Sequence, residues 1–123
     1  MSRYFGLLLL FMAHHLSAQM EKTFIYEITL LDQFKHRALW TAREHRIQNQ
    51  HLDYLDSLTQ SGTLQMAGII DQGLEAQTGL IILKTNDYDE ANSIALKDPS
   101  VAEGMMTVRL RPLNIYFKPK EEK

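Results

Sequence analysis

The chain has 123 residues, of which 45% are hydrophobic and 23% are charged, and this composition is typical of one folded globular domain rather than of a disordered segment. The net charge is −2 with both signs interspersed, which argues against the strongly basic surface of a nucleic-acid-binding protein. Cysteine is absent, which excludes disulfide bonds, thiolate metal sites and cysteine nucleophiles.

The N-terminal segment has the layout of a secretory signal peptide. Arg3 precedes an apolar run from Tyr4 to Ala13, and a small-residue cleavage site ends at Ala18. The run is about ten residues long, against roughly 20 for a helix that spans a bilayer, so a stable membrane anchor is not expected. We therefore expect a signal peptide at 1–18, export to the periplasm or the exterior, and one mature domain at 19–123. The alternative is that the apolar run is a buried N-terminal strand or helix.

The first element predicted in the mature chain is a strand at 23–31. Aromatic and β-branched side chains of one parity recur there, namely Phe24, Tyr26, Ile28 and Leu30. A period of two with these residue types is typical of a strand with one strongly buried face. Residues 32–39 are predicted to form a connection or a first helical turn.

A long helix is predicted from about Thr41 or Arg43 to Gln60. Its apolar stripe recurs at helical spacing and consists of Ile47, His51, Tyr54, Leu55 and Leu58. Gly62 lies where a left-handed residue commonly ends a helix. The stripe therefore places an imidazole at a position where a core leucine would be expected.

Two strands are predicted next, at 63–70 and 79–85, joined by a polar, glycine-bearing loop at 71–79. One face of the first of these strands is expected to carry Leu64, Met66, Gly68 and Ile70. The nearly continuous apolar run of the second strand is typical of a central position in a sheet.

A second helix is predicted to begin at Asp87, which has the spacing of a capping box with Glu90; Asn86 is an alternative cap. Its apolar stripe consists of Ala91, Ile94 and Ala95. The helix should end at Asp98-Pro99, because proline disfavours a helical conformation at the residue before it.

A short turn or single helical turn is predicted at 99–104, followed by a final strand at 105–118 in which Pro112 marks a bulge or an edge position. The resulting order is β-α-β-β-α-β. This order is typical of the ferredoxin-like α+β fold, in which two helices pack on one face of a four-stranded antiparallel sheet.

The second face of such a sheet also needs a cover. Parity does not assign the sides, and the candidates for this face are Phe24, Leu80, Ile82 and Val108. An open apolar face of this size would exceed what a monomer normally exposes. A symmetric homodimer with the sheets face to face is therefore the expected assembly.

His51 and Asp98 are the candidate catalytic residues. An imidazole can act as a general acid or base near neutral pH when a pocket and an orienting acceptor are present. The fold brings the end of the second helix towards the first, so Asp98 could bind one ring nitrogen and leave the other free to take or give a proton. The alternatives are a histidine that fills core space and an aspartate that caps a turn.

Other polar residues give weaker signals. Glu44, His45 and His51 lack the spacing of a metal triad, so no metal is expected. Arg109 and Arg111 share a strand parity and could bind an anionic substrate, but surface arginines more often face solvent or pair with acidic neighbours. Phosphate-binding loops, serine nucleophile motifs and nucleotide fingerprints are absent from the sequence, so no cofactor is expected.

The order and spacing of several short motifs resemble the YCII-related family over about residues 22–118. The matching positions are His51-Leu52, Leu58 with Gly62, Ala67-Gly68, Asp98-Pro99, and Gly104 before Met105. The resemblance implies a ferredoxin-like fold of the dimeric α/β barrel type and an active site built from a histidine and an aspartate, which here would be His51 and Asp98.

The resemblance also implies small-molecule chemistry, since at least one family member is a dehydrochlorinase that acts on a chlorinated aromatic compound. Two positions depart from the family pattern: Ile69 replaces a usual proline, and Ser100 replaces a usual bulky aromatic residue. Three hypotheses follow. They are a lyase-type or isomerase-type enzyme that uses His51 and Asp98, a non-catalytic module that binds a small ligand, and a purely structural dimer or subunit.

Overall fold

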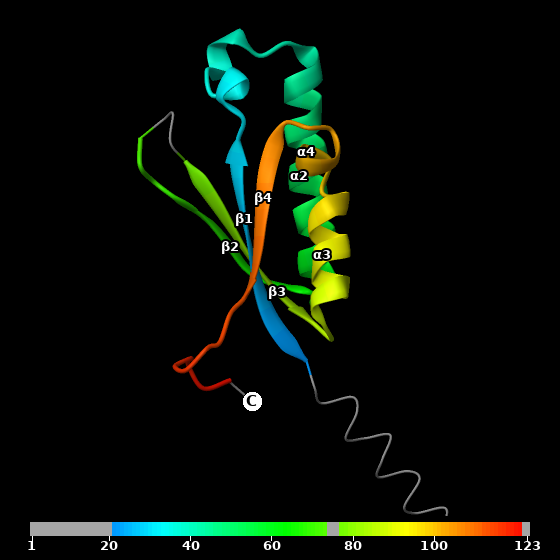
Figure 1. Cartoon of the computed structure of the whole chain (residues 1–123), viewed down its shortest axis with the longest axis vertical. Helices are drawn as coiled ribbons and strands as arrows, with labels where there is room; N and C mark the ends of the chain where they lie inside the picture. The colour runs from blue at the N-terminus through cyan, green and yellow to red at the C-terminus, as the bar shows by residue number, and fades with distance from the viewer. Residues whose placement is uncertain (1–20, 74–76, 122–123) are drawn as a thin grey trace, which may run out of the picture.

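The computed structural model describes residues 21–73 and 77–121, and within these ranges its elements follow the predicted order (Figure 1). The predicted signal peptide at 1–18 lies outside the described residues. In the part of the chain that is described, helices long and apolar enough to cross a membrane are absent.

The sheet contains the strands β1 (Lys22–Leu30), β2 (Leu64–Ile70), β3 (Thr78–Thr85) and β4 (Met106–Pro112). All neighbouring pairs are antiparallel, and the spatial order is β2-β3-β1-β4. The central position predicted for β3 is confirmed. The order is that of the ferredoxin-like fold, so the predicted fold class is confirmed as well.

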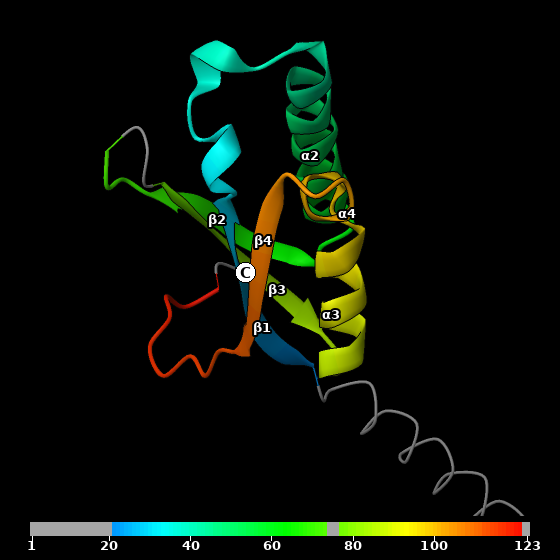
Figure 2. The same ribbon diagram turned by 45° about the horizontal axis from the view of Figure 1, so that its top comes forward.

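Helices cover one face of the sheet. They are α2 (Ala42–Gln60), α3 (Tyr88–Lys97) and the short α4 (Pro99–Ala102). Figures 1 and 2 show all three on the same side of the strands. The connection from β1 to α2 contains two short 3₁₀ helices, η1 (Asp32–Phe34) and η2 (Arg37–Leu39).

Side-chain and glycine caps fix the ends of the two long helices. The Thr41 side chain accepts a hydrogen bond from the backbone N–H of Arg43, and Gly62 has the left-handed φ of 80° that follows α2. At α3, the Asp87 side chain accepts from the N–H of Glu90 at 2.8 Å. Glu90 in turn accepts from the N–H of Asn86 at 3.0 Å, so the predicted capping box closes on Asn86 rather than on Asp87.

The core lies between the sheet and the helices. Its buried members are Phe24, Tyr26, Ile28, Leu64, Ile81, Leu83, Ala91 and Ala95. The β1 residues of one parity therefore face the helices, as the alternation of the sequence predicts. Gly79 is required by close packing, because a Cβ at this position would lie 2.7 Å from the side chain of Ile28.

Two details of the predicted strands are wrong. The final strand ends at Pro112 instead of continuing to residue 118. Pro112 pairs with Phe24, close to the start of β1, so β1 offers almost no further residues for pairing. A register shift between Leu64 and Met66 puts them on opposite faces of β2, although an unbroken alternation would place them together.

The second face of the sheet has an apolar half and a charged half. Cross-strand partners share a face, and the register places Ile25 and Ile82 on it with Met66 beside them. Leu80 and Ile82 are thus correctly predicted for this face. Phe24 and Val108 are not, because both pack in or against the core on the helix side.

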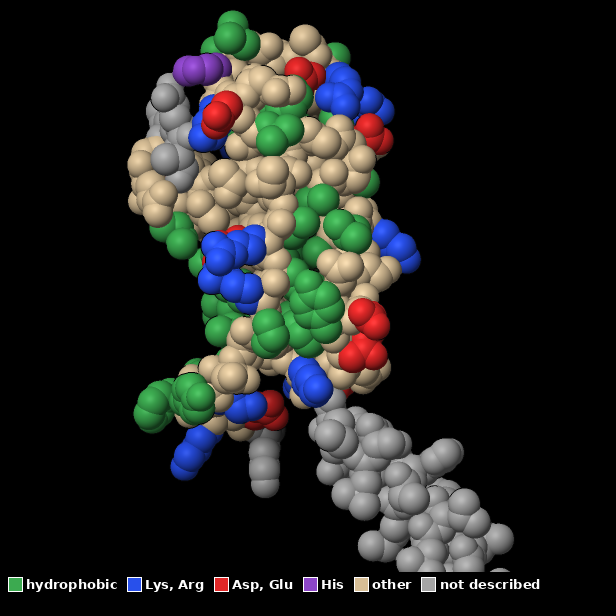
Figure 3. All heavy atoms as spheres, in the orientation of Figure 1, with side chains coloured by type: hydrophobic (Ala, Val, Ile, Leu, Met, Phe, Trp, Pro, Cys, Tyr) green, Lys and Arg blue, Asp and Glu red, His purple; other side chains and the backbone are tan. Residues whose placement is uncertain are grey.

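The apolar half is strongly exposed at β2, where Met66 is 65% and Ile70 is 41% accessible. In the charged half, Arg111 pairs with Glu27, and Arg109 lies opposite Glu27 in the register. Figure 3 shows a group of basic side chains near the middle of the molecule in this view, with apolar side chains around it. This face can therefore offer both apolar contact and charge to a partner.

Candidate functional site

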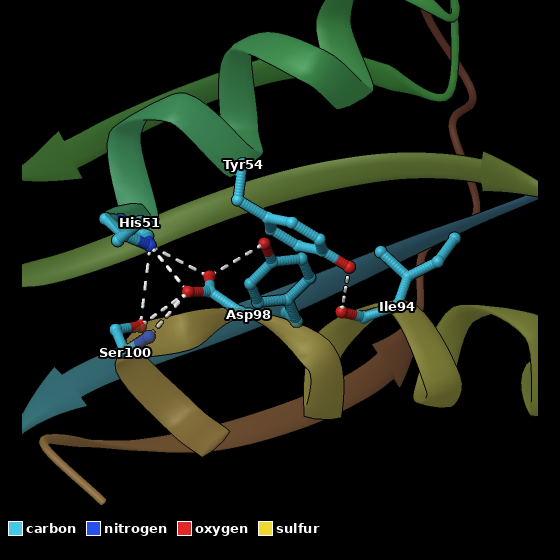
Figure 4. Close-up of polar contacts among 6 residues, drawn as sticks. His51, Tyr54, Ile94, Asp98 and Ser100 are labelled. Atoms are coloured by element: carbon cyan, nitrogen blue, oxygen red, sulfur yellow. Dashed lines mark hydrogen bonds and ion pairs between the residues drawn. The ribbon is translucent and has the colours of Figure 1, made fainter. Parts of the chain in front are cut away.

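His51 is brought to the inside of the molecule by the apolar stripe of α2. It is one of the buried residues of that helix, with 4% of its surface accessible. Its Nδ1 atom lies 2.8 Å from Oδ1 and 2.9 Å from Oδ2 of Asp98 (Figure 4). The structure thus brings together the two residues that the sequence nominated, from positions 47 apart in the chain.

Asp98 occupies the junction between α3 and α4, where it ends the first helix and begins the second. Its backbone is extended, as expected before Pro99, and this turns the fully buried carboxylate towards α2. The carboxylate accepts from the backbone N–H of Ser100 at 3.0 Å and from the Ser100 hydroxyl at 2.8 Å. Asp98 is therefore both the cap of α4 and the partner of His51.

Two tyrosine hydroxyls make buried or partly buried hydrogen bonds near His51 and Asp98. The Tyr26 hydroxyl donates to Oδ2 of Asp98 at 3.2 Å from the central strand β1. The Tyr54 hydroxyl, one helical turn after His51, donates to the carbonyl of Ile94 at 2.7 Å and ties α2 to α3. The imidazole and carboxylate are thus held by three elements whose positions the core fixes.

The surroundings keep Asp98 ionised. Burial favours its neutral form, but the hydrogen bond and charge of His51 and the two hydrogen bonds from Ser100 outweigh burial and hold the pKa of Asp98 below its ordinary value. Burial first, and then the charge and hydrogen bond of Asp98, raise the pKa of the Tyr26 hydroxyl far above its ordinary value, so Tyr26 remains a donor. An ionised carboxylate accepts only, so Nδ1 of His51 carries the proton.

The other side of His51 meets a pocket of about 250 Å³ between α2, the sheet and the loop that follows β1. Nε2 makes no hydrogen bond with the described residues. The lining is mostly apolar and consists of Ile28, Leu30, Lys35, Arg37, Gln48, His51, Leu52, Leu55, Ala67, Gly68, Ile69, Gln77, Gly79, Ile81 and Met106. A neutral imidazole with a free Nε2 in such a pocket can accept a proton from a bound molecule and return it.

The remaining candidates lie elsewhere. Arg109 and Arg111 are on the sheet face opposite the helices and do not line the pocket. His45 packs edge-on against the Trp40 ring, with 5.3 Å between ring centroids, and Glu44 accepts from the Thr41 hydroxyl at 2.5 Å. Clusters of three side chains able to hold a metal are absent from the described residues.

Sequence reasoning missed the support given by Tyr26 and Ser100 and the place of Gln48 in the pocket. The parity of β1 marks Tyr26 as a core residue without revealing where its hydroxyl points. Ser100 stood out only as a departure from a family pattern, and the structure makes it a fully buried donor to Asp98. Gln48 lies three residues before His51 on α2, and this spacing was the one available signal for its position.

The family of this chain follows from a sequence comparison. The model of the YCII-related domain matches residues 27–114. The chain belongs to the YCII-related family. Among curated proteins, none matches the chain.

Three solved structures are similar to this YCII-related protein but share little sequence with it. The 5-chloro-2-hydroxyhydroquinone dehydrochlorinase of Burkholderia phenoliruptrix is 16% identical, with a TM-score of 0.57 over 75% of this chain and 93% of that one. An uncharacterized protein of Thermotoga maritima is 15% identical, with a TM-score of 0.48 over 76% and 99%. A cofactor-independent oxygenase of Streptomyces nogalater is 9% identical, with a TM-score of 0.47 over 83% and 99%. At 16% identity the likeness to the dehydrochlorinase concerns the fold alone.

Proposed function

We propose that this protein is a small-molecule enzyme of the lyase or isomerase type, in which His51 transfers a proton and Asp98 orients it. The single observation that carries the proposal is the 2.8 Å contact between a buried carboxylate and Nδ1 of His51, whose ring also lines a pocket. An imidazole that lines a cavity and is held by a charged partner is a candidate general acid or base. The dehydrochlorinase of the same fold removes a leaving group from a ring compound, which is chemistry of this class.

In the proposed reaction one proton moves through Nε2 of His51. Nε2 of neutral His51 takes a proton from an activated carbon of the substrate, and the electron pair of the broken C–H bond forms a new double bond. In a lyase reaction, formation of this double bond expels a leaving group with its bonding electron pair, and the imidazolium gives its proton to that group or to water. In an isomerisation the electron pair shifts along the conjugated system, and the imidazolium returns the proton to another carbon. The Asp98 carboxylate stabilises the imidazolium in either case.

Hydrogen–deuterium exchange tests this role without knowledge of the natural substrate. Compact keto acids and hydroxylated ring compounds are incubated with the protein in D₂O, and loss of activated C–H signals is followed by NMR. The wild-type protein should accelerate exchange for at least one compound, and His51→Asn should abolish the acceleration while remaining folded. Exchange that persists in His51→Asn would overturn the proposal, as would the absence of exchange throughout the panel.

We also propose that the apolar half of the second sheet face forms a homodimer, with Met66 and Ile70 at its centre. Exposed apolar side chains on a sheet next to charged ones are typical of an association surface. Sedimentation of the 19–123 chain should show a dimer, and the double change Met66→Glu with Ile70→Glu should give a folded monomer. Leu39→Glu is the matched control, because Leu39 is 76% exposed in η2. A wild-type monomer would contradict the proposal.

Export with cleavage after Ala18 is a further proposal, which is supported by the signal-like N-terminal segment. Intact-mass measurement of the protein from its native source tests it. A chain that begins at Gln19 supports export, whereas a chain that retains Met1 contradicts it.

A further inference from the structure

Gln48 carries a polar atom that the fold does not satisfy. Its Oε1 is buried and has no hydrogen-bond partner among the described residues, where it is the one side-chain atom of this kind. Buried acceptors are nearly always paired, because an unpaired one loses its hydrogen bonds to water without replacement. Gln48 lines the pocket one helical turn before His51. Because Oε1 is buried, a donor on a bound molecule can satisfy this atom once the Gln48 side chain turns towards the cavity that it lines.

The charge of the pocket lining gives a second, independent indication. Lys35 and Arg37 both line the pocket, and carboxylates are absent from its described lining. The partner of Lys35 is Asp32, at 2.7 Å, whose side chain is 96% exposed and lies outside the pocket. Arg37 lies 5.1 Å from the centre of the Trp40 ring. The loop between β1 and α2 thus presents positive charge to a ligand.

We propose that this pocket binds a compact anionic molecule that also carries a hydroxyl or N–H donor. The donor binds Gln48 Oε1, the anionic group faces Lys35 and Arg37, and the apolar body lies between them against the sheet. This inference rests on the proposed function, because it takes the pocket beside His51 as the substrate site. It names a substrate class and makes Gln48 a specificity-determining residue.

The size of the pocket limits the ligand. A volume of about 250 Å³ exceeds the roughly 150 Å³ of an apolar cavity that holds benzene, and it is below the roughly 300 Å³ at which drug-sized sites begin. One substituted ring, or an aliphatic acid of similar bulk, fits this space. Small residues help to keep it open, since Gly79 and Ala67 are both part of the lining.

Calorimetric titration with matched one-ring probes tests the proposal. The probes are benzoate, its three hydroxy isomers, the corresponding methoxybenzoates and benzyl alcohol. At least one hydroxybenzoate should bind about tenfold more tightly than benzoate and its methoxy counterpart, because one hydrogen bond to a buried group is lost in each of those two. Benzyl alcohol, which lacks the anionic group, should bind more weakly than the preferred hydroxybenzoate.

Substitutions assign these preferences to residues. Gln48→Met keeps the bulk of the side chain but removes the amide, and it should equalise the affinities for hydroxybenzoate and benzoate. Gln50→Met on the exposed side of α2 is the matched control and should leave the preference intact. Lys35→Met combined with Arg37→Met should remove the preference for the anion, whereas Lys84→Met should not.

Several results would overturn the inference. These are equal binding of hydroxylated and unsubstituted acids by the wild type, a hydroxyl preference that survives Gln48→Met, or no binding of any probe at millimolar concentration. The calorimetry requires no turnover. If the protein prefers hydroxylated acids but catalyses no C–H exchange, the inference is supported and the acid–base role of His51 is contradicted. If it catalyses exchange but shows no hydroxyl preference, the acid–base role is supported and the inference is contradicted.

Discussion

The two nitrogen atoms of His51 lie in opposite surroundings. Around Nδ1, the buried groups of Asp98, Ser100 and Tyr26 satisfy one another with hydrogen bonds. On the pocket side, the lining is mostly apolar and Gln48 Oε1 has no partner. A fully satisfied network holds one arrangement, whereas an unsatisfied acceptor beside a cavity leaves room for a ligand. The polar cluster thus fixes the position of the ring, and the pocket side is where the proposed substrate would bind.

The largest effect is expected when the polar cluster loses its carboxylate. Asp98→Ala removes the acceptor of His51, Ser100 and Tyr26 together and leaves their donors buried and unpaired. We expect the free energy of unfolding to fall by about 3–5 kcal/mol, as when one partner of a buried pair is removed. Urea denaturation followed by circular dichroism measures it. Asp89→Ala, at an exposed site of α3, is the control, and a loss no larger than in this control would contradict the account.

Protonation of Asp98 in acid should destabilise the protein less than Asp98→Ala does. A protonated carboxyl group still offers an acceptor oxygen to the neighbouring donors. The folded pKa of Asp98 lies below its unfolded value of roughly 3.9, so the unfolded chain binds a proton first as the pH falls. The stabilisation by Asp98 is complete above that value and is lost as the pH falls through the folded pKa. Urea midpoints across this acid range should fall more steeply for the wild type than for Asp98→Asn. Identical slopes would break the prediction.

A substitution at His51 distinguishes the structural role of Nδ1 from the proposed catalytic role of Nε2. His51→Asn places an amide N–H near the position of Nδ1 and removes the group that could accept a proton. We expect a loss of about 1 kcal/mol in stability, comparable to one hydrogen bond, and complete loss of catalysed C–H exchange. Urea denaturation and exchange NMR are measured on the same sample. An unfolded His51→Asn protein would show that the ring is mainly structural.

The smallest effect on the free energy of unfolding is expected for a substitution that only adds a larger side chain to the pocket. Ala67→Leu adds bulk to an exposed lining position of β2, so stability should change by no more than about 0.5 kcal/mol. Affinity for the preferred hydroxybenzoate should nevertheless drop about tenfold or more, because the added side chain competes for the pocket. Gln65→Leu, an exposed position of β2 outside the lining, should leave the affinity unchanged. Unaltered binding by Ala67→Leu would place the ligand elsewhere.

Much of this arrangement could be predicted from local sequence patterns. The helical stripe identified His51 as inward-facing, and the Asp98-Pro99 pair marked the helix end that meets it once the order of elements is known. Hydrogen-bond direction could not be predicted, because the parity that buries Tyr26 is the same whether its hydroxyl meets a carboxylate or a backbone group.

The misplaced parts have tertiary causes. The bulge between Leu64 and Met66 depends on the register with β3, and alternation along a single strand does not reveal it. The early end of β4 depends on where β1 begins. Gln48 stands next to the apolar stripe, where a glutamine is ordinarily solvated, and only the folded structure shows that its Oε1 is buried.

The most direct test of the central claim is the tautomer of His51, observed by long-range ¹H–¹⁵N NMR of the free and ligand-bound protein. The account predicts that the neutral ring carries its proton on Nδ1, held by Asp98. The unprotonated Nε2 resonance should shift when the preferred hydroxybenzoate binds. A neutral ring protonated on Nε2, or an Nε2 signal that no ligand changes, would contradict it.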